Sequence, residues 1–189
     1  MSSTGALEVT RNLITQIQIK GPAGATLVAV RKFRGWEGCD AGSIAITGAY
    51  GPWEYTWSSI GECTFGQFLK SLNMPYAMEK LAGNEMYEFD ADATLTAVRA
   101  YICEARKHDS LSKDKARDFF DLAEGMKSAL SPYEAYAGDR EDLVWQLMDG
   151  EPITRKRVKE GIREFWDSIW PAIVNEILTM ESEAAAQAV

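Results

Sequence analysis

The hydrophobic periodicity of the sequence changes at Thr64, and this change limits the possible folds more than any other feature. Before Thr64, apolar and polar residues alternate, most clearly where Trp53, Tyr55 and Trp57 are each separated by one polar residue. A period of two is typical of a β-strand, whose successive side chains point to opposite faces. After Thr64, apolar residues recur every three or four positions, as in an amphipathic helix. Strands followed by helices predict an α+β fold.

Four short strands are predicted within residues 7–60, and glycine or proline marks the turns between them. They cover residues 13–19, 26–33, 43–47 and 53–57. Sequential short strands favour a small antiparallel meander with one covered face. The aromatic residues of the fourth strand could form an exposed platform that stacks bases or sugars. Packing against the following helix is the alternative, because aromatic side chains dominate ordinary cores.

Polar capping residues predict where several helices begin. Thr64 and Gln67 can form a capping box, in which each side chain accepts a hydrogen bond from an amide of the first turn. Ser131 precedes a proline at the first helical position and a glutamate at the third, which predicts a second start. Single caps are expected at Asp92 and Ser112.

The last helix is predicted over about residues 154–180, because one apolar stripe runs along it. Its members are Val158, Ile162, Phe165, Ile169, Ile173 and Ile177. Pro171 should bend this helix, since proline lacks the amide donor. We expect one compact unit, in which an acidic helical region (63–180) packs on the N-terminal β-meander (1–62). Residues 181–189 are expected to form a frayed tail.

Charge is divided in the same way as the periodicity. Residues 1–80 hold seven Lys/Arg and six Asp/Glu, a net charge of +1, whereas residues 81–189 hold thirteen and twenty-two, a net charge of −9. Hydrophobic residues make up 46% of the chain, which is enough for a folded core. The acidic surplus argues against direct nucleic-acid binding, because phosphates would be repelled. It favours a partner with a basic surface.

Two groups of acids are the main candidates for a partner-binding face. They lie in span 81–149, which has fifteen acidic and eight basic residues. Exposed carboxylates set several ångströms apart can imitate the phosphates of a duplex, while the alternative is that they keep the protein soluble. The candidates are Asp114, Asp118, Asp121, Glu124, Asp139, Glu141 and Asp142.

A basic patch at the start of the predicted last helix is the second candidate. Cations at a helix N-terminus oppose the helix dipole, which hints at an anion or an acidic partner. Pairing with the acidic helices is the alternative. The patch consists of Arg155, Lys156, Arg157 and Lys159.

The sequence holds no recognisable catalytic constellation. Phosphate-binding loops, nucleophile elbows and zinc motifs are missing from the 189 residues. Cys103 lies five positions before His108, a spacing that turns the two side chains apart on a helix. A cluster of acids could hold a hard cation such as magnesium, although a solvated loop with a helix cap is the alternative. Its members are Glu85, Glu88, Asp90 and Asp92. We therefore expect no cofactor, no catalytic residue and no firm metal site.

Three aromatic motifs occur in a recognisable order. They are YGPWEYTW (50–57), FGQFLKSL (65–72) and FWDSIWP (165–171). Together they resemble a family of small proteins encoded by tailed phages and prophages, over about residues 44–171. The resemblance implies a phage setting inside a bacterial cell and assigns no catalytic residue. Acidic phage accessory proteins of this size often resemble inhibitors of host defence.

The resulting hypothesis is a non-enzymatic inhibitor of the anti-CRISPR kind, acting in the bacterial cytoplasm. Its partner would be a host protein or ribonucleoprotein complex, whose basic nucleic-acid-binding surface the acidic helices would occupy. No run of 18 apolar residues predicts a membrane span. Two alternatives stay open: a metal-dependent enzyme acting on nucleic acid or nucleotides, and a phage structural or assembly protein. The oligomeric state is not predicted.

Overall fold

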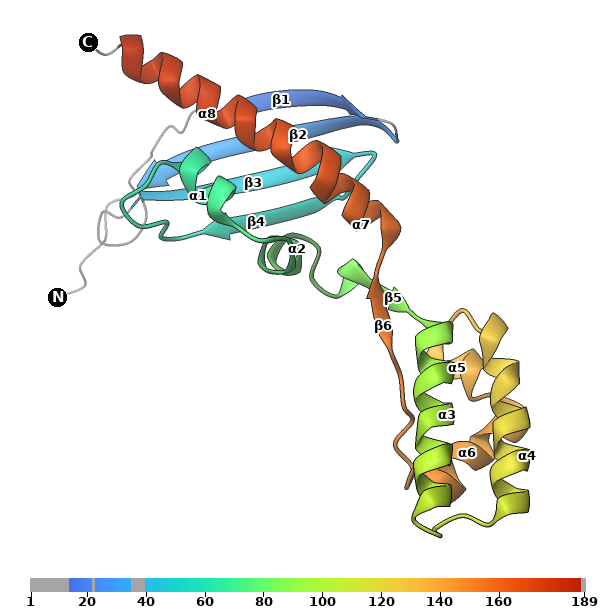
Figure 1. Ribbon diagram of the computed structural model, residues 1–189. Helices are drawn as coiled ribbons and strands as arrows, with labels where there is room; N and C mark the ends of the chain where they lie inside the picture. Colours follow the sequence, from blue (N-terminus) through green and yellow to red (C-terminus); the bar gives the residue numbers. More distant parts are fainter. Residues whose placement is uncertain (1–13, 22, 35–39, 188–189) are drawn as a thin grey trace, which may run out of the picture. The chain divides into compact units, whose positions relative to one another are not determined.

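The computed structural model describes residues 14–21, 23–34 and 40–187 (Figure 1). The chain divides into two compact units. The sheet unit combines residues 1–86 with residues 160–189, and the helical unit comprises residues 87–159. The helices expected within a single region are thus distributed over both units. The helical unit has its own hydrophobic core, which is why these residues form a compact body by themselves.

The sheet unit is built on a four-stranded antiparallel meander, which confirms the predicted sheet. The strands are β1 (Ile14–Gly21), β2 (Gly24–Arg34), β3 (Asp40–Gly48) and β4 (Trp53–Trp57), in the spatial order β1-β2-β3-β4. The register aligns Ile17, Val28, Ile46 and Trp53 across the four strands. Because all four lie on one face, a helix layer on that face can cover them.

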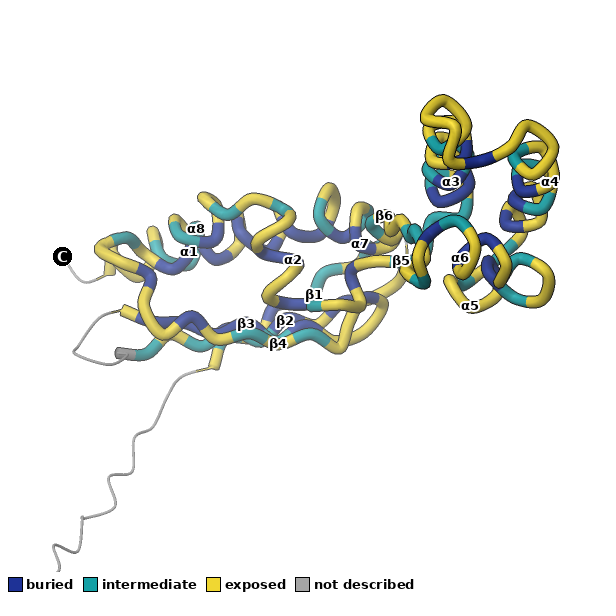
Figure 2. Tube along the Cα trace, turned by 90° about the horizontal axis from the view of Figure 1, so that it is seen from below, coloured by how far each residue is buried: buried dark blue, intermediate teal, exposed yellow. Residues whose placement is uncertain are grey.

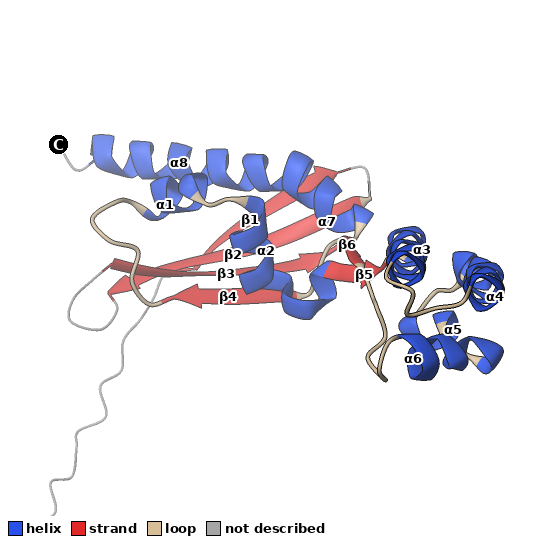
Figure 3. Cartoon of the chain, turned by 60° about the horizontal axis from the view of Figure 1, so that its bottom comes forward, coloured by secondary structure: helices blue, strands red, loops and turns tan. Residues whose placement is uncertain are grey.

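Helices cover one face of this sheet (Figures 1 and 3). They are α1 (Phe65–Ser71), α2 (Met74–Ala82) with the short η2 (Gly83–Met86), α7 (Glu160–Glu164) and α8 (Trp170–Gln187). The predicted capping box begins α1: the Gln67 amide donates to Thr64 Oγ1 at 3.3 Å, and the Thr64 amide donates to Gln67 Oε1 at 3.1 Å.

The aromatic residues of β4 belong to the core of the sheet unit. Trp57 is buried and packs against Phe65 and Phe68 of α1, with ring centroids 6.1 and 5.6 Å apart. Trp53 meets Phe165 edge to face at 5.0 Å. Trp57 therefore packs under the following helix as expected, whereas Trp53 packs against Phe165 near the C-terminal helix, and an open stacking platform is wrong.

The C-terminal helix differs from its prediction at both ends. It begins at Glu160 rather than near residue 154, because residues 156–158 form a strand instead. It continues to Gln187, so the segment predicted as a frayed tail is helical as far as the structure describes it. Before Pro171 the helix widens into a π-turn, η5 (Phe165–Ile169), where the Trp170 amide donates to the Phe165 carbonyl. This turn lies where the proline removes a donor from the helix.

The helical unit starts and ends with a small antiparallel ribbon. Strand β5 (Tyr87–Phe89) pairs with β6 (Lys156–Val158). Between them lie α3 (Ala91–Lys107), α4 (Lys113–Glu124), η3 (Gly125–Ser128), α5 (Pro132–Ala135), η4 (Gly138–Arg140) and α6 (Glu141–Leu147). Figure 2 shows that positions along α3 and α4 range from buried to exposed, as expected for amphipathic helices.

Two of the three helix caps predicted in this unit are confirmed. The side chains of Ser112 and Ser131 accept amide hydrogen bonds at the starts of α4 and α5. The cap of α3 is Asp90 rather than Asp92, and its carboxylate accepts from the Ala93 amide at 2.9 Å. The inward faces meet in a core that includes Val98, Ile102, Phe119, Ala123, Met126 and Leu143.

Candidate functional site

Three acidic residues form a strip along the outer side of α4. Asp114, Asp118 and Asp121 are spaced four and three positions apart, which places them on one side of the helix. Phe119 and Ala123 point to the opposite side and are buried in the core. All three aspartates are exposed, and none forms an ion pair with any residue that the structure describes.

The fourth predicted acid of α4 is engaged within the protein. Arg99 of α3 donates to Glu124 Oε2, and Lys127 Nζ lies 3.4 Å from Glu124 Oε1. The hydrogen bond from Arg99, followed by that from Lys127, lowers the pKa of Glu124. The guanidinium of Arg99 also lies 4.3 Å from the centroid of the Phe120 ring. Glu124 therefore holds α3 to α4 and has less capacity left for a partner.

The second acidic group lies around the start of α6. Asp139, Glu141 and Asp142 are exposed, and within the described chain they form no ion pairs. Arg140 stands among them, but it donates to the carbonyls of Ala135 and Glu134 at 2.7 and 2.9 Å. The guanidinium of Arg140 therefore supplies hydrogen bonds to the carbonyl groups at the end of α5. Acids at a helix N-terminus also gain from the dipole, so part of their role is structural.

The basic patch does not lie on a helix. Lys156 and Arg157 belong to β6, while Arg155 and Lys159 flank this strand. The prediction that these cations oppose a helix dipole is therefore wrong. Arg157 Nε donates to Glu88 Oε1 on β5 at 2.7 Å, and this hydrogen bond raises the pKa of Arg157. The patch is thus partly paired within the ribbon, as the alternative interpretation held.

Charge is segregated within the helical unit. Residues 87–159 contain fifteen acidic and twelve basic residues, a net charge of −3. The segment 90–151 alone contains fourteen acidic and eight basic residues, a net charge of −6. The unit as a whole is less acidic than span 81–149 suggested, because the cations around β6 belong to it. The surplus negative charge lies on the helices and loops.

The acids considered for a hard cation are not brought together. Asp90 caps α3, and Glu88 pairs with Arg157. Glu85 lies in η2 of the sheet unit, whereas Asp92 lies in the first turn of α3. Among the described residues, no group of three or more His, Cys, Asp or Glu side chains could hold a metal ion. The geometry fits the alternative interpretation, a loop with a helix cap.

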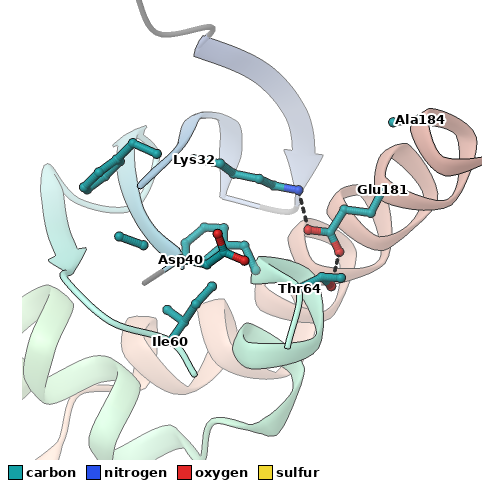
Figure 4. A pocket seen from close by; sticks show the side chains of 9 residues that line it. Lys32, Asp40, Ile60, Thr64, Glu181 and Ala184 are labelled. Carbon is teal, nitrogen blue, oxygen red and sulfur yellow. Dashed lines mark hydrogen bonds and ion pairs between the residues drawn. The ribbon is translucent and has the colours of Figure 1, made fainter. Parts of the chain in front are cut away.

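The structure adds a cavity in the sheet unit that the sequence did not indicate (Figure 4). It has a volume of about 470 Å³ and is lined by residues of β2, β3, α1 and α8. Figure 4 shows Lys32 of β2 and Thr64 both turned toward Glu181 of α8. Lys32 forms an ion pair with Glu181, and the Thr64 hydroxyl donates to the same carboxylate.

Glu181 acts as a latch between three elements. The Gly66 amide of α1 also donates to it, at 3.1 Å to Oε1. Partial burial raises the pKa of this carboxyl group, but the hydrogen bonds from Lys32, Thr64 and Gly66 together bring it below its ordinary value. Because these donors occupy both carboxylate oxygens, Glu181 fixes the end of α8.

Residues 7–179 match the model of a phage family, Phage_phiTE_072. None of the curated proteins and none of the solved structures matches the chain. The family match agrees with the phage setting that the aromatic motifs implied, and it extends beyond residues 44–171 at both ends. Among the residues that the structure describes, no helix is both long enough and apolar enough to span a membrane.

Proposed function

The chain belongs to a phage protein family, and from this premise we propose that it is a non-enzymatic inhibitor of a bacterial defence complex. The complex is of the CRISPR kind, and the protein acts in the cytoplasm of the host cell. One observation carries the proposal: six of the seven predicted partner-binding acids are exposed and form no ion pair within the described chain. They are therefore available to the basic groove of a protein that holds nucleic acid.

The spacing of the α4 strip supports imitation of nucleic acid. Asp114 and Asp121 are seven residues apart, which corresponds to about 10 Å along a helix that rises about 1.5 Å per residue. One strand of duplex DNA carries a charge about every 3.4 Å, so the same length holds about three phosphates. The three carboxylates equal this number of phosphates, although Lys115 and Arg117 lie in the same segment, and the acids around α6 extend the negative surface.

Charge complementarity of this kind acts first on the rate of association. Opposite potentials steer two proteins together, and the effect weakens as salt screens charges beyond a Debye length of about 8 Å at physiological ionic strength. Binding to the target should therefore weaken with added salt. It should also be mutually exclusive with nucleic acid, because both ligands use the same groove.

The test is an affinity pull-down from infected host cells, read by mass spectrometry. The wild-type chain should recover a nuclease or an effector complex, and added nucleic acid should displace it. The variant Asp114→Asn/Asp118→Asn/Asp121→Asn should lose this recovery. The matched control Glu54→Gln/Glu176→Gln/Glu183→Gln removes three exposed charges from the sheet unit and should retain it.

Two results would contradict the proposal. One is a target complex that binds the protein and its nucleic acid at the same time. The other is the presence of this protein in purified phage particles at stoichiometric levels, since an inhibitor acts inside the cell and a structural protein is packaged.

A further inference from the structure

Two large aromatic side chains of the helical unit are unusually exposed. Tyr133 of α5 is 84% exposed and Trp145 of α6 is 72% exposed. Both line a groove with a volume of about 280 Å³, together with Pro132 and Pro152. Exposed aromatic residues beside a concave surface are typical of binding sites, because aromatic anchors supply much of the energy of protein interfaces.

The floor of this groove is held in place by its own bonds. The Tyr136 hydroxyl donates to the Ile153 carbonyl at 2.5 Å. Burial raises the pKa of Tyr136 to about 12, although the bond to Ile153 opposes this, so the hydroxyl stays a donor at neutral pH. The bond joins the end of α5 to the segment before β6, which makes the floor a fixed surface.

The aromatic wall formed by Trp145 is also positioned by packing. Gly150 adopts a φ of +84°, and a Cβ added there would lie 3.2 Å from Trp145 Cζ3. The indole therefore lies beside the glycine backbone on one edge while most of its surface stays exposed. An exposed ring face is open for a ligand to stack on.

One carboxylate faces this groove. Among the described residues that line it, Glu141 alone is charged. The adjacent Arg140 is engaged with backbone carbonyls, and Glu134 accepts a hydrogen bond from the Leu130 amide at 2.8 Å. Glu141 forms no ion pair with a described residue, so its charge is available to a ligand.

We propose that this groove binds an arginine side chain of a basic partner protein. A guanidinium group can stack on the aromatic faces of Tyr133 and Trp145 while donating two hydrogen bonds to Glu141. A lysine ammonium lacks the planar face and the paired donors. A proline-rich segment also fits aromatic-lined grooves, but the carboxylate and the net charge of −6 on residues 90–151 favour a cation. The inference rests on the proposed function only for the basic character of the partner.

The test compares two fluorescent peptides of equal charge, nona-arginine and nona-lysine, by anisotropy with the full chain. We expect nona-arginine to bind about tenfold more tightly, as one anchoring residue typically contributes. This preference should disappear in Trp145→Ala, Tyr133→Ala and Glu141→Gln. It should persist in the control Tyr101→Ala, which removes a 42% exposed tyrosine of α3 outside the groove. Circular dichroism establishes that each variant is folded. Because two separate aromatic variants are measured, the test still applies if one of them does not fold.

The outcomes separate this inference from the proposed function. Equal, salt-sensitive binding of both peptides, unchanged by Trp145→Ala and Tyr133→Ala, would overturn the arginine groove and leave the acidic surface intact. Binding of neither peptide at low salt would contradict both. A proline-rich peptide that binds more tightly than nona-arginine and depends on Trp145 would assign the groove to a polyproline segment instead.

Discussion

Glu181 of the sheet unit and Asp118 of the helical unit are both helical carboxylates, but their surroundings differ. Glu181 accepts hydrogen bonds from Lys32 of β2 and from Thr64 and Gly66 at the start of α1. Asp118 is exposed, and no residue of the described chain forms an ion pair with it. A carboxylate whose oxygens are occupied stabilises the fold, whereas one without partners is available for binding. We therefore expect the stability of the protein to depend on Glu181 and the binding of a partner to depend on Asp118.

Removing the Glu181 carboxylate should have the largest effect on stability. Glu181→Ala leaves Lys32, Thr64 and the Gly66 amide without their acceptor, which should cost about 2–3 kcal/mol because hydrogen bonds to a charged group are lost. The control Glu183→Ala removes an exposed acid two residues later and should change stability by less than about 0.5 kcal/mol. Urea denaturation followed by tryptophan fluorescence measures both. Equal midpoints for the two variants would show that Glu181 is not a latch.

A side chain added beside Glu181 gives the second test of its role in stability. In Gly66→Ala the new Cβ would lie 2.7 Å from Glu181 Oε2 and 2.9 Å from Leu178 Cδ2, so the side chains of Glu181 and Leu178 must move and the bonds to Glu181 are disturbed. We expect a loss of about 1–3 kcal/mol in the free energy of unfolding. Gly161→Ala is the matched control, because its Cβ meets no atom within 4 Å and alanine favours a helix. The control should be neutral or slightly stabilising, and a destabilisation equal to that of Gly66→Ala would refute the steric argument.

The pH dependence of stability tests the contribution of the Glu181 carboxylate in a different way. Because the pKa of Glu181 is lowered in the folded protein, its contribution is present above the ordinary pKa of 4.5 and is lost as the pH falls through the folded value. The difference in stability between wild type and Glu181→Gln should therefore shrink from pH 7 toward pH 3. Denaturation midpoints at a series of pH values measure it. A difference in stability that grows as the pH falls would contradict a lowered pKa of Glu181 in the folded protein.

Neutralising the α4 strip should have the smallest effect on stability. Asp114→Asn/Asp118→Asn/Asp121→Asn removes charges that form no ion pair with a described residue and that repel one another. The free energy of unfolding should change by less than about 0.5 kcal/mol per substitution, in either direction. Thermal unfolding followed by circular dichroism measures the change. A large destabilisation would mean that these aspartates serve the fold.

The local features of the fold could be predicted from the sequence, because their signals lie within a few residues. The alternation around Trp57 predicted a strand, and the capping residues Thr64, Ser112 and Ser131 predicted helix starts. Helical spacing indicated the series of acids on α4, but not which of them stay free of ion pairs, since Glu124 pairs with Arg99 of another helix. These elements depend on hydrogen bonds between neighbours in the chain, which sequence patterns record directly.

The features that were missed depend on residues far apart in the chain. Val158 fitted the apolar stripe of the last helix, but it pairs with Tyr87 in the β5–β6 ribbon instead. Glu181 lies 117 residues from Thr64, so nothing near it indicated a latch rather than a frayed tail. Long-range pairing of this kind overrides local propensity and leaves no local signal.

We propose that the outward acids of the helical unit bind a basic surface in place of nucleic acid. The most direct test measures the affinity of the purified target complex for the wild-type chain and for the α4 strip variant over a range of salt concentrations. We expect wild-type binding to weaken steadily as salt is added, the variant to bind much more weakly, and nucleic acid to compete with the wild-type chain for the target. Binding that is independent of salt and equal for the two proteins would contradict it.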